Sequence, residues 1–428
     1  MNLELSNIVN ILGIIDKLKK LLILGANPET AHLVKKANLM GVYTIVTDNL
    51  KYSPAKKCAN EAQYIDGTDV DGIVSFVKAN NIDGVLLGTA DPLVQSYFKI
   101  CKKLNFPCYV TKDSVDVFSD KEKLKLICKK FGVESVPQYS LEDINNNNVI
   151  FPIVVKPVDG RSGKGITVCY NKNEIEAAIL KAKKFSSSGE VLFERYMSCD
   201  DVFFYYTFKN GTMVLSAMAD RYTTREQVGF APVVLGAKYP SKYLNLYLNS
   251  LHKNMCKMFC SLGIKDGILL IQAFVENDNF YVYDPGFRFQ GGAPHILIEK
   301  VNGLDQEKMM INFALGLHDS QNILEVNDPC FKNKVVGSQV ILLKAGKIKK
   351  IIGLDKISSL KEVCNITQRL FEGDVVTIIG SEQQVLARVH IVANDLDSFK
   401  NTVSIINKEV VAFDEFGNVM NLKGLEIE

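Results

Sequence analysis

The chain has 428 residues, of which 47% are hydrophobic and 23% are charged, and its formal net charge is +2. This composition is typical of a soluble globular protein with two to four domains. So small a net charge predicts neither a nucleic-acid partner nor an anionic membrane surface. The ten cysteines include no Cys-x-x-Cys pair, and the N-terminus lacks a signal-peptide pattern. We therefore expect reduced, mostly buried thiols and a cytoplasmic location.

Residues 21–112 alternate between apolar segments and helical patterns. Four apolar segments are predicted strands: 21–24, 42–46, 85–87 and 108–110. Asn27 is a plausible N-cap for the first helix, with Pro28 after it. Alternating strands and helices predict a parallel sheet with helices on both faces. A dinucleotide-binding unit is a weaker alternative, because the turn at residues 25–28 does not follow G-x-G-x-x-G.

A helix is predicted after a capping box in which Ser119 is the N-cap and Glu122 lies three residues further on. A second helix is expected over residues 243–262, where apolar residues recur at helical spacing. From about residue 335 the pattern changes to short strands, followed by a helix at 396–406. We interpret this last part as a separate α+β domain, in which Arg388 and His390 have structural roles.

The most informative segment is an apolar strand that ends in Lys156 and leads into a glycine-rich turn, Gly160 to Gly165. Glycines accept positive φ, so their N–H groups can turn toward one phosphate, and the lysine adds positive charge. The segment is not a Walker A loop, because no Ser or Thr follows a Gly-Lys pair. A phosphate grip and a purely structural hairpin are about equally supported by this segment alone.

A second informative segment presents Asp284 at the end of a strand and Arg288 four residues later, before a glycine turn. The carboxylate is suited to Mg²⁺, and the guanidinium is suited to a phosphate or carboxylate. A surface ion pair is the alternative, and such pairs contribute little to stability.

In their order and spacing these segments resemble the ATP-grasp superfamily of carboxylate–amine ligases, over about residues 21–320. The resemblance implies α/β and α+β architecture in three parts. They are a Rossmann-like front domain at 1–112 (with 1–20 as an N-terminal extension), an ATP-grasp domain at 113–330 with a lid at about 134–190, and a small biotin-carboxylase-like domain at 331–428. It also implies ATP and Mg²⁺, with a small-molecule carboxylate and an amine as substrates and a possible homodimer.

The resemblance also assigns roles to residues of this sequence. Lys121 and Arg288 would be catalytic, and Asp284 with Gln272 would bind the metal. The remaining implied nucleotide-binding residues are the second lysine, the glycine loop, the adenine hinge and the ribose acid: Lys156, Gly160, Ser162, Gly163, Gly165, Glu194, Arg195, Tyr196, Met197 and Asp201. Lys121 would bind phosphate as well.

The sequence departs from the family at the metal site. The usual pattern is Glu, then Glu twelve residues later, then Asn two beyond, whereas this chain has Gln272, Asp284 and Gly286. An amide oxygen can still be a ligand. We expect an ATP-dependent ligase that forms a C–N bond through an acyl phosphate. Two alternatives stay open: a nucleotide-binding module with degraded catalysis, and an ATP-grasp kinase.

Overall fold

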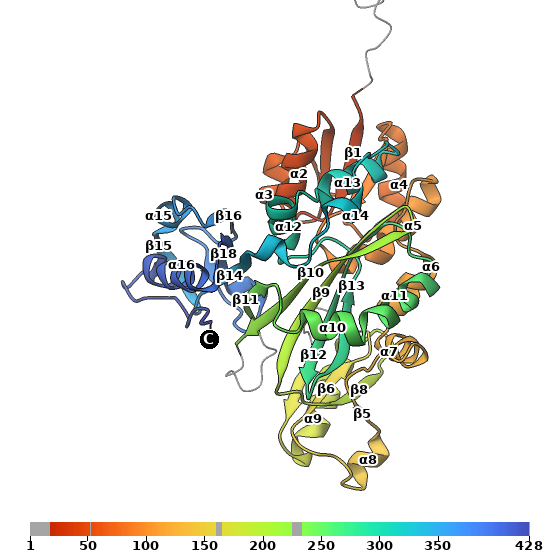
Figure 1. Ribbon diagram of the computed structural model, residues 1–428, viewed down its shortest axis with the longest axis vertical. Helices are drawn as coiled ribbons and strands as arrows, with labels where there is room; N and C mark the ends of the chain where they lie inside the picture. The colour runs from red at the N-terminus through yellow and green to blue at the C-terminus, as the bar shows by residue number, and fades with distance from the viewer. Residues whose placement is uncertain (1–17, 52, 160–164, 225–232, 428) are drawn as a thin grey trace, which may run out of the picture.

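The computed structural model describes residues 18–51, 53–159, 165–224 and 233–427. Over these residues the strands form one parallel sheet near the N-terminus and three antiparallel sheets, with helices packed around them (Figure 1). This mixed architecture confirms the predicted fold class.

The front sheet has four parallel strands in the order β3-β2-β1-β4. Its strands are β1 (Lys20–Leu24), β2 (Tyr43–Thr47), β3 (Glu61–Gln63) and β4 (Gly84–Leu87), and its helices are α2 (Thr30–Leu39), α3 (Pro54–Cys58), α4 (Val70–Ala79) and α5 (Val94–Leu104). The fourth predicted strand, at 108–110, is wrong. Tyr109 is buried there against the rings of Tyr97 and Phe287, at 5.0 and 5.2 Å between centroids, in an irregular segment. An apolar run can arise from burial alone, without any strand. Residues 108–110 are such a case, because they pair with no strand among the described residues.

Two predicted helix starts are corrected. Helix α2 begins at Thr30, with Glu29 as its N-cap residue, rather than at Pro28. Helix α7 (Lys121–Lys130) is capped by Asp120 and not by Ser119. The Asp120 carboxylate accepts from the N–H groups of the second and third helical residues at 2.9 and 3.1 Å. An ionised oxygen at the positive end of a helix is a stronger acceptor than a hydroxyl.

A small antiparallel sheet with strand order β5-β8-β6-β7 forms the lower end of the molecule in Figure 1. Its elements are β5 (Gln138–Tyr139), α8 (Leu141–Asn145), β6 (Ile153–Pro157), β7 (Thr167–Cys169), α9 (Ile175–Lys183) and β8 (Val191–Arg195). A separate core that includes Ile153, Val155 and Phe193 packs between its strands and helices. We call this part the lid sheet.

The central sheet has eight antiparallel strands in the order β13-β12-β9-β10-β11-β14-β18-β16. Their bounds are β9 (Asp200–Lys209), β10 (Thr212–Thr223), β11 (Val234–Tyr239), β12 (Gly267–Glu276), β13 (Asn279–Gly286), β14 (Val335–Leu342), β16 (Val363–Gln368) and β18 (Val385–Ala393). Because β14 pairs with β11, hydrogen bonding continues across the predicted domain boundary near residue 330. The boundary itself stays a prediction.

The predicted helix at 243–262 is two helices, α10 (Leu244–Ser250) and α11 (His252–Ser261), separated at Leu251. The Ser250 hydroxyl donates to the Leu246 carbonyl at 2.7 Å, a contact that bends helices. Three other helices contact strands of the central sheet: α6 (Lys112–Phe118), α12 (Pro294–Asn302) and α14 (Ile323–Val326). Helix α13 (Gln306–Ala314) instead packs on β4 and α2 of the front sheet.

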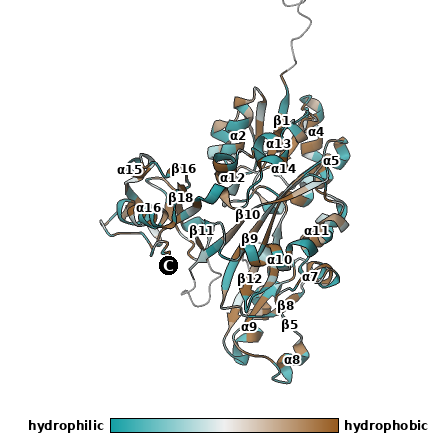
Figure 2. Cartoon of the chain, in the orientation of Figure 1, coloured by the Kyte–Doolittle hydropathy of each residue, from teal (hydrophilic) through white to brown (hydrophobic). Residues whose placement is uncertain are grey.

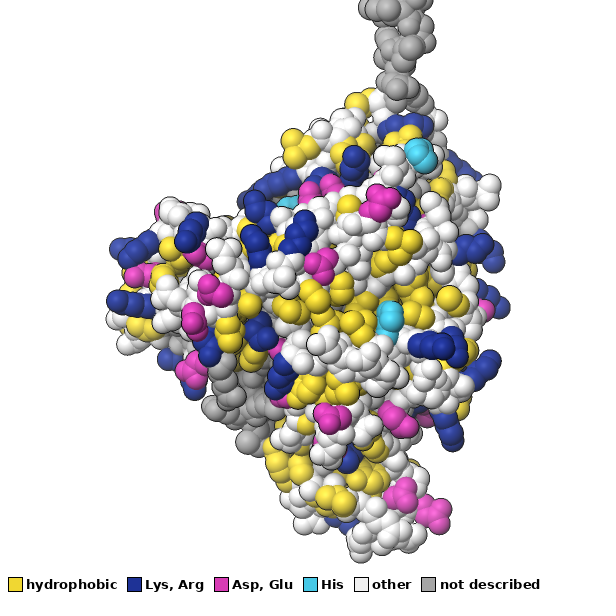
Figure 3. Space-filling model, in the orientation of Figure 1, with side chains coloured by type: hydrophobic (Ala, Val, Ile, Leu, Met, Phe, Trp, Pro, Cys, Tyr) yellow, Lys and Arg dark blue, Asp and Glu magenta, His cyan; other side chains and the backbone are white. Residues whose placement is uncertain are grey.

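The C-terminal elements outside the central sheet are β15 (Gly346–Ile352), α15 (Leu354–Ser358), β17 (Val375–Val376), α16 (Leu396–Glu409) and β19 (Val411–Asp414). Figure 2 shows hydrophilic and hydrophobic colours on both helices and strands, as expected when one face of an element meets a core and the other meets solvent. Basic and acidic side chains are interspersed on the face in Figure 3.

All ten cysteines are free. Three of them are buried, at 101, 128 and 169, while two, at 260 and 330, are exposed, so the expectation of mostly buried thiols is wrong. Among the described helices, none combines the length and hydrophobicity needed to cross a bilayer.

The packing of β4 against α13 gives a first prediction. A Cβ atom on Gly84 would lie 2.3 Å from the Ala314 carbonyl oxygen, whereas one on Gly291 would meet nothing within 4 Å. We expect Gly84→Ala to lower the free energy of unfolding by about 1–3 kcal/mol through overpacking. Gly291→Ala should change it by less than about 0.5 kcal/mol. Urea unfolding curves of the two variants measure the difference, and equal curves would contradict this packing.

Candidate active site

The lid sheet meets helix α7 through a buried network of two lysines and one carboxylate. Lys156 lies on β6 and Glu194 on the neighbouring β8, and their side chains form an ion pair that is more than nine-tenths buried. Lys125 on α7 reaches the other Glu194 oxygen at 2.8 Å and also donates to the Val136 carbonyl at 2.5 Å. The structure therefore brings two predicted site residues, Lys156 and Glu194, into contact, together with a third residue that the sequence analysis missed.

The charge state of Glu194 follows from this network. Burial raises the pKa of its carboxyl, but the attraction and hydrogen bonds of Lys156 and Lys125 outweigh that effect, and the pKa is lowered overall. Glu194 is thus an ionised side chain that holds two ammonium groups at the base of the lid sheet.

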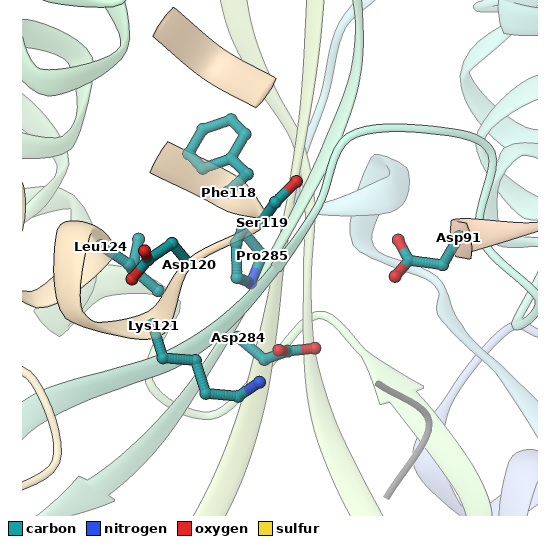
Figure 4. A pocket seen from close by; sticks show the side chains of 8 residues that line it. All are labelled: Asp91, Phe118, Ser119, Asp120, Lys121, Leu124, Asp284 and Pro285. Atoms are coloured by element: carbon teal, nitrogen blue, oxygen red, sulfur yellow. The ribbon is translucent and has the colours of Figure 1, made fainter. Parts of the chain in front are cut away.

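A pocket lies between α7, the end of β13 and the front sheet. Figure 4 shows the eight residues that line it: Asp91, Phe118, Ser119, Asp120, Lys121, Leu124, Asp284 and Pro285. Lys121 extends toward Asp284 in this view, and its Nζ lies 3.5 Å from the Val158 carbonyl oxygen, just before the glycine loop. Lys121 and Lys125 are one helical turn apart, so α7 aims both amines at the region between the pocket and the lid sheet.

Asp284 has an environment opposite to that of Glu194. Burial raises the pKa of its carboxyl, and the like charge of Asp91 adds to the effect. Lys121, Lys156 and Arg288 act in the other direction but do not outweigh burial. A carboxylate in this position would be stabilised by any further positive charge that entered the pocket.

Gln272 is the cross-strand partner of Asp284. Its Nε2 donates to Asp284 Oδ2 at 3.0 Å, and its Oε1 accepts from the Tyr283 hydroxyl at 3.2 Å. The amide therefore presents its nitrogen to Asp284. A metal ligand here needs the oxygen, so metal binding requires the amide to turn by about 180°.

Asp201 is buried in polar contacts within the central sheet. Arg221 donates to its Oδ2 at 2.7 Å, and the Tyr283 hydroxyl oxygen lies 3.2 and 3.3 Å from its two oxygens. Tyr283 has a single hydroxyl proton, which these contacts share with the contact to Gln272. Arg221 also donates to the Tyr283 hydroxyl at 2.7 Å, while its own Nε is buried without a hydrogen-bond partner among the described residues. The predicted ribose acid thus lies near Gln272, through Tyr283, and its neighbours Arg221 and Tyr283 had no predicted role.

Arg288 connects the site to the front sheet. Its Nε donates to Asp91 Oδ1 at 3.0 Å and its NH1 donates to the Phe289 carbonyl at 2.7 Å. Asp91 follows β4, so the carboxyl end of the parallel sheet faces the pocket, where ligands bind in open α/β sheets. The sequence analysis predicted the strand at 85–87 that precedes this segment but assigned Asp91 no role.

The structure describes some of the predicted glycine-loop and hinge residues but not others. Gly160, Ser162 and Gly163 lie outside the described residues. Gly165 has φ +78°, and a Cβ there would meet Phe185 at 3.0 Å, so a side chain would be strained.

The N–H groups of Arg195 and Tyr196 donate to the carbonyls of Pro137 and Pro152 at 2.9 and 3.3 Å. Arg195 also pairs with Glu276 on β12, and Met197 is buried. Both hinge N–H groups are therefore already hydrogen-bonded, to carbonyls of the residues that directly precede β5 and β6 of the lid sheet.

A family model described as the D-ala D-ala ligase C-terminus matches residues 129–227. The carbamoyl phosphate synthase large chain of Clostridium perfringens is 19% identical over 396 residues, which are 85% of this chain and 35% of the relative. This chain therefore spans about a third of that relative's length.

Two solved structures show the same fold. The L-amino acid ligase of Bacillus licheniformis has a TM-score of 0.76, with 16% identity over 94% of this chain and 100% of that one. The biotin carboxylase domain of Hydrogenobacter thermophilus 2-oxoglutarate carboxylase, solved as a dimer with MgADP and bicarbonate, has a TM-score of 0.74 with 16% identity, covering 95% of this chain and 91% of that one.

The buried network predicts a pH-dependent effect of Glu194→Gln. Removing the charge leaves two buried lysines without their partner, and we expect a loss of about 3 kcal/mol at pH 7. The folded-state pKa of Glu194 lies below its ordinary value of 4.5. The stabilisation is therefore fully present above about pH 4.5 and is lost as the pH falls through the folded-state value.

Urea unfolding at pH 7 and at pH 3–4 measures this difference. The gap between the native chain and Glu194→Gln should narrow at the lower pH. The control is Glu190→Gln, at an exposed glutamate that precedes the same strand. A gap that is constant with pH would contradict the charge network.

Proposed function

We propose that this chain, an ATP-grasp protein by its fold and its family match, is an ATP-dependent ligase that joins a carboxylate to an amine. The ATP-grasp resemblance predicted from the sequence is confirmed by these comparisons. The observation that carries the proposal is the charge arrangement at the pocket between α7, β13 and the front sheet, where Lys121 and the half-buried Asp284 share one lining. The charges of Lys121, Lys156 and Arg288 all act on the Asp284 carboxyl. Three cations around one carboxylate suit a polyphosphate and its metal ion.

In this proposal the two lysines bind the nucleotide phosphates. Lys156 exchanges part of its contact with Glu194 for a phosphate oxygen, and Lys121 approaches from the first turn of α7. The glycine loop covers the phosphates, and residues 194–197 contact the adenine. Asp201 shares its buried carboxylate between Arg221 and the ribose hydroxyls.

The donor set fits a magnesium ion. Asp284 is disfavoured as a carboxylate by burial and by the nearby Asp91, so a divalent cation would stabilise it. Mg²⁺ takes one or two carboxylates together with substrate phosphates and water. Asp284, and Gln272 after its amide turns, would hold the ion, which would neutralise charge on the phosphates.

The proposed reaction has two steps. A substrate carboxylate oxygen attacks the γ-phosphorus of ATP, the bond to the β–γ bridging oxygen breaks, and ADP and an acyl phosphate form. An amine then attacks the acyl carbon, phosphate leaves, and the amine loses a proton. The chain contributes positioning and charge stabilisation, with Arg288 near the developing charge, and lid closure excludes water from the acyl phosphate.

Oxygen transfer tests this reaction directly. Amino acids are the first acids and amines to try, because a protein of similar fold is named an L-amino acid ligase. Candidate acids carry ¹⁸O in the carboxylate, and ADP release is recorded with each amine. One ¹⁸O per turnover should appear in inorganic phosphate. A stable phosphorylated acid without amine incorporation would instead support a kinase.

The degraded-module alternative has one observation in its favour, the Gln272 nitrogen that faces Asp284. Tight ATP binding without Mg²⁺-dependent turnover on any acid–amine pair would support it.

A homodimer is part of our proposal as well, because the Hydrogenobacter domain of similar fold is named a dimer. Sedimentation of the purified chain measures it.

We expect Lys156→Ala to weaken ATP binding about tenfold to a hundredfold, because it removes a charge-assisted hydrogen bond worth about 1.5–3 kcal/mol. Isothermal titration calorimetry with a non-hydrolysable ATP analogue measures the affinity. The control is Lys183→Ala, at an exposed lysine on α9 of the same lid sheet, and it should leave the affinity unchanged. Equal affinities in the native chain and Lys156→Ala would remove Lys156 from the site.

Gln272→Glu should give effects of opposite sign with and without magnesium. Without the ion it replaces a hydrogen bond to Asp284 by a second negative charge, and we expect a lower Tm. With Mg²⁺ and nucleotide the added carboxylate should lower the half-saturating ion concentration on the order of tenfold.

Thermal unfolding across a magnesium titration measures both effects. Gln383→Glu, at an exposed residue, is the control for the added charge, and Asp284→Asn should remove the ion dependence and turnover while ATP binding largely persists. An unchanged magnesium dependence in Gln272→Glu would place the ion elsewhere.

A further inference from the structure

Two histidines and a glutamate from three helices meet where the front sheet packs on the rest of the chain. His32 lies in the first turn of α2, His295 in the first turn of α12 and Glu307 in the first turn of α13. None of them is among the residues proposed above for ATP or Mg²⁺.

The three side chains converge on a small volume. Glu307 Oε2 lies 2.6 Å from His32 Nδ1, and Glu307 Oε1 lies 3.2 Å from His295 Nε2. One ligand atom from each residue can be chosen so that all lie within 4.8 Å of one another. The side chains of Glu307 and His295 are 1% and 4% exposed, and that of His32 is 36% exposed.

Two of these atoms have no hydrogen-bond partner in the part of the chain that the structure describes. They are Glu307 Oε1 and His295 Nε2, both fully buried. Although 3.2 Å apart, they are not aligned as donor and acceptor. Buried polar atoms are rarely left without a partner, because losing water without compensation costs free energy. These two atoms therefore lack the compensation that a bound ligand would supply.

We propose that His32, His295 and Glu307 bind one divalent transition-metal ion of the zinc type. Two imidazole nitrogens and a carboxylate oxygen are ligands that Zn²⁺ prefers, at about 2.0–2.2 Å. Around a tetrahedral ion such distances place ligand atoms about 3.4 Å apart, close to the spacing of His295 and Glu307. His32 has to move outward from Glu307, and its partial exposure allows that movement and provides a path for the ion.

The surrounding charges are compatible with a bound cation. Lys36, one turn after His32, is neutralised by Glu299 at 2.6 Å and Asp305 at 3.0 Å. Glu299 lies one turn after His295 on the same helix. The ion would therefore join α2 of the front sheet to α12 and α13, and a fourth coordination position would remain for water on the side of His32.

Zinc binding by the full chain, measured without nucleotide, tests the proposal independently of the ligase activity. After treatment with a chelator and its removal, the chain is titrated with Zn²⁺ in competition with a chromophoric chelator. We expect one tight equivalent per chain, weakened at least about tenfold in His32→Ala and His295→Ala. Co²⁺ at the same site should give the visible absorption of a four-coordinate complex, and this band should be lost in both variants.

Two controls separate this site from other histidines. His318→Ala removes an exposed histidine and should change nothing. His252→Ala removes a histidine 3.6 Å from a cysteine sulfur, Cys256 Sγ, and should also leave the tight equivalent intact. His32→Ala alters the most exposed ligand, so it tests binding without emptying a core position. No tight zinc in the native chain, or a zinc affinity in His32→Ala and His295→Ala that equals that of the native chain, would overturn the proposal and leave an ion-paired triad.

Discussion

The register of the central sheet decides which polar side chains meet at the candidate site. Strand β12 pairs with β13 on one side and β9 on the other, which places Gln272 opposite Asp284. Strand β9 pairs in turn with β10, which places Asp201 opposite Arg221. A slip of one residue would turn every side chain of a strand to the other face and separate these groups.

Irregularities in the pairing are part of this arrangement. The turn Asn210-Gly211, with positive φ at both residues, joins β9 to β10 as a two-residue hairpin. Regular pairing from that turn would place Asp201 opposite Asp220, and like charges directly opposite are destabilising. A bulge between residues 215 and 217 shifts the register by one and brings Arg221 opposite Asp201 instead.

Much of the site could be predicted because its signals are local. Lys156 before a glycine loop, and Asp284 four residues before Arg288, are short patterns with direct chemical meaning. The pairing of Arg288 with Asp91 spans 197 residues, and no local pattern indicates which distant segments pack together. Lys125 did leave a signal, since it is one turn after Lys121 on the same helix face, but only the fold brings Glu194 to it. The sequence likewise showed short strands after residue 335 but not their pairing with β11.

That continuous sheet also supports the loop that follows Arg288. Arg388 on β18 pairs with Glu29 at the start of α2 at 2.9 Å and donates to the Gly291 carbonyl. His390, two residues along, lies 3.0 Å from the Gly292 carbonyl oxygen, and burial lowers its pKa to about 3. A neutral His390 can donate one hydrogen bond to that carbonyl without a buried charge. Strand β18 thus holds the backbone just after Arg288 of the candidate site, through the contacts of Arg388 and His390 with two glycine carbonyls. These contacts are of the structural kind expected for both residues. Through Glu29, Arg388 also binds β18 to the start of α2 beside the front sheet.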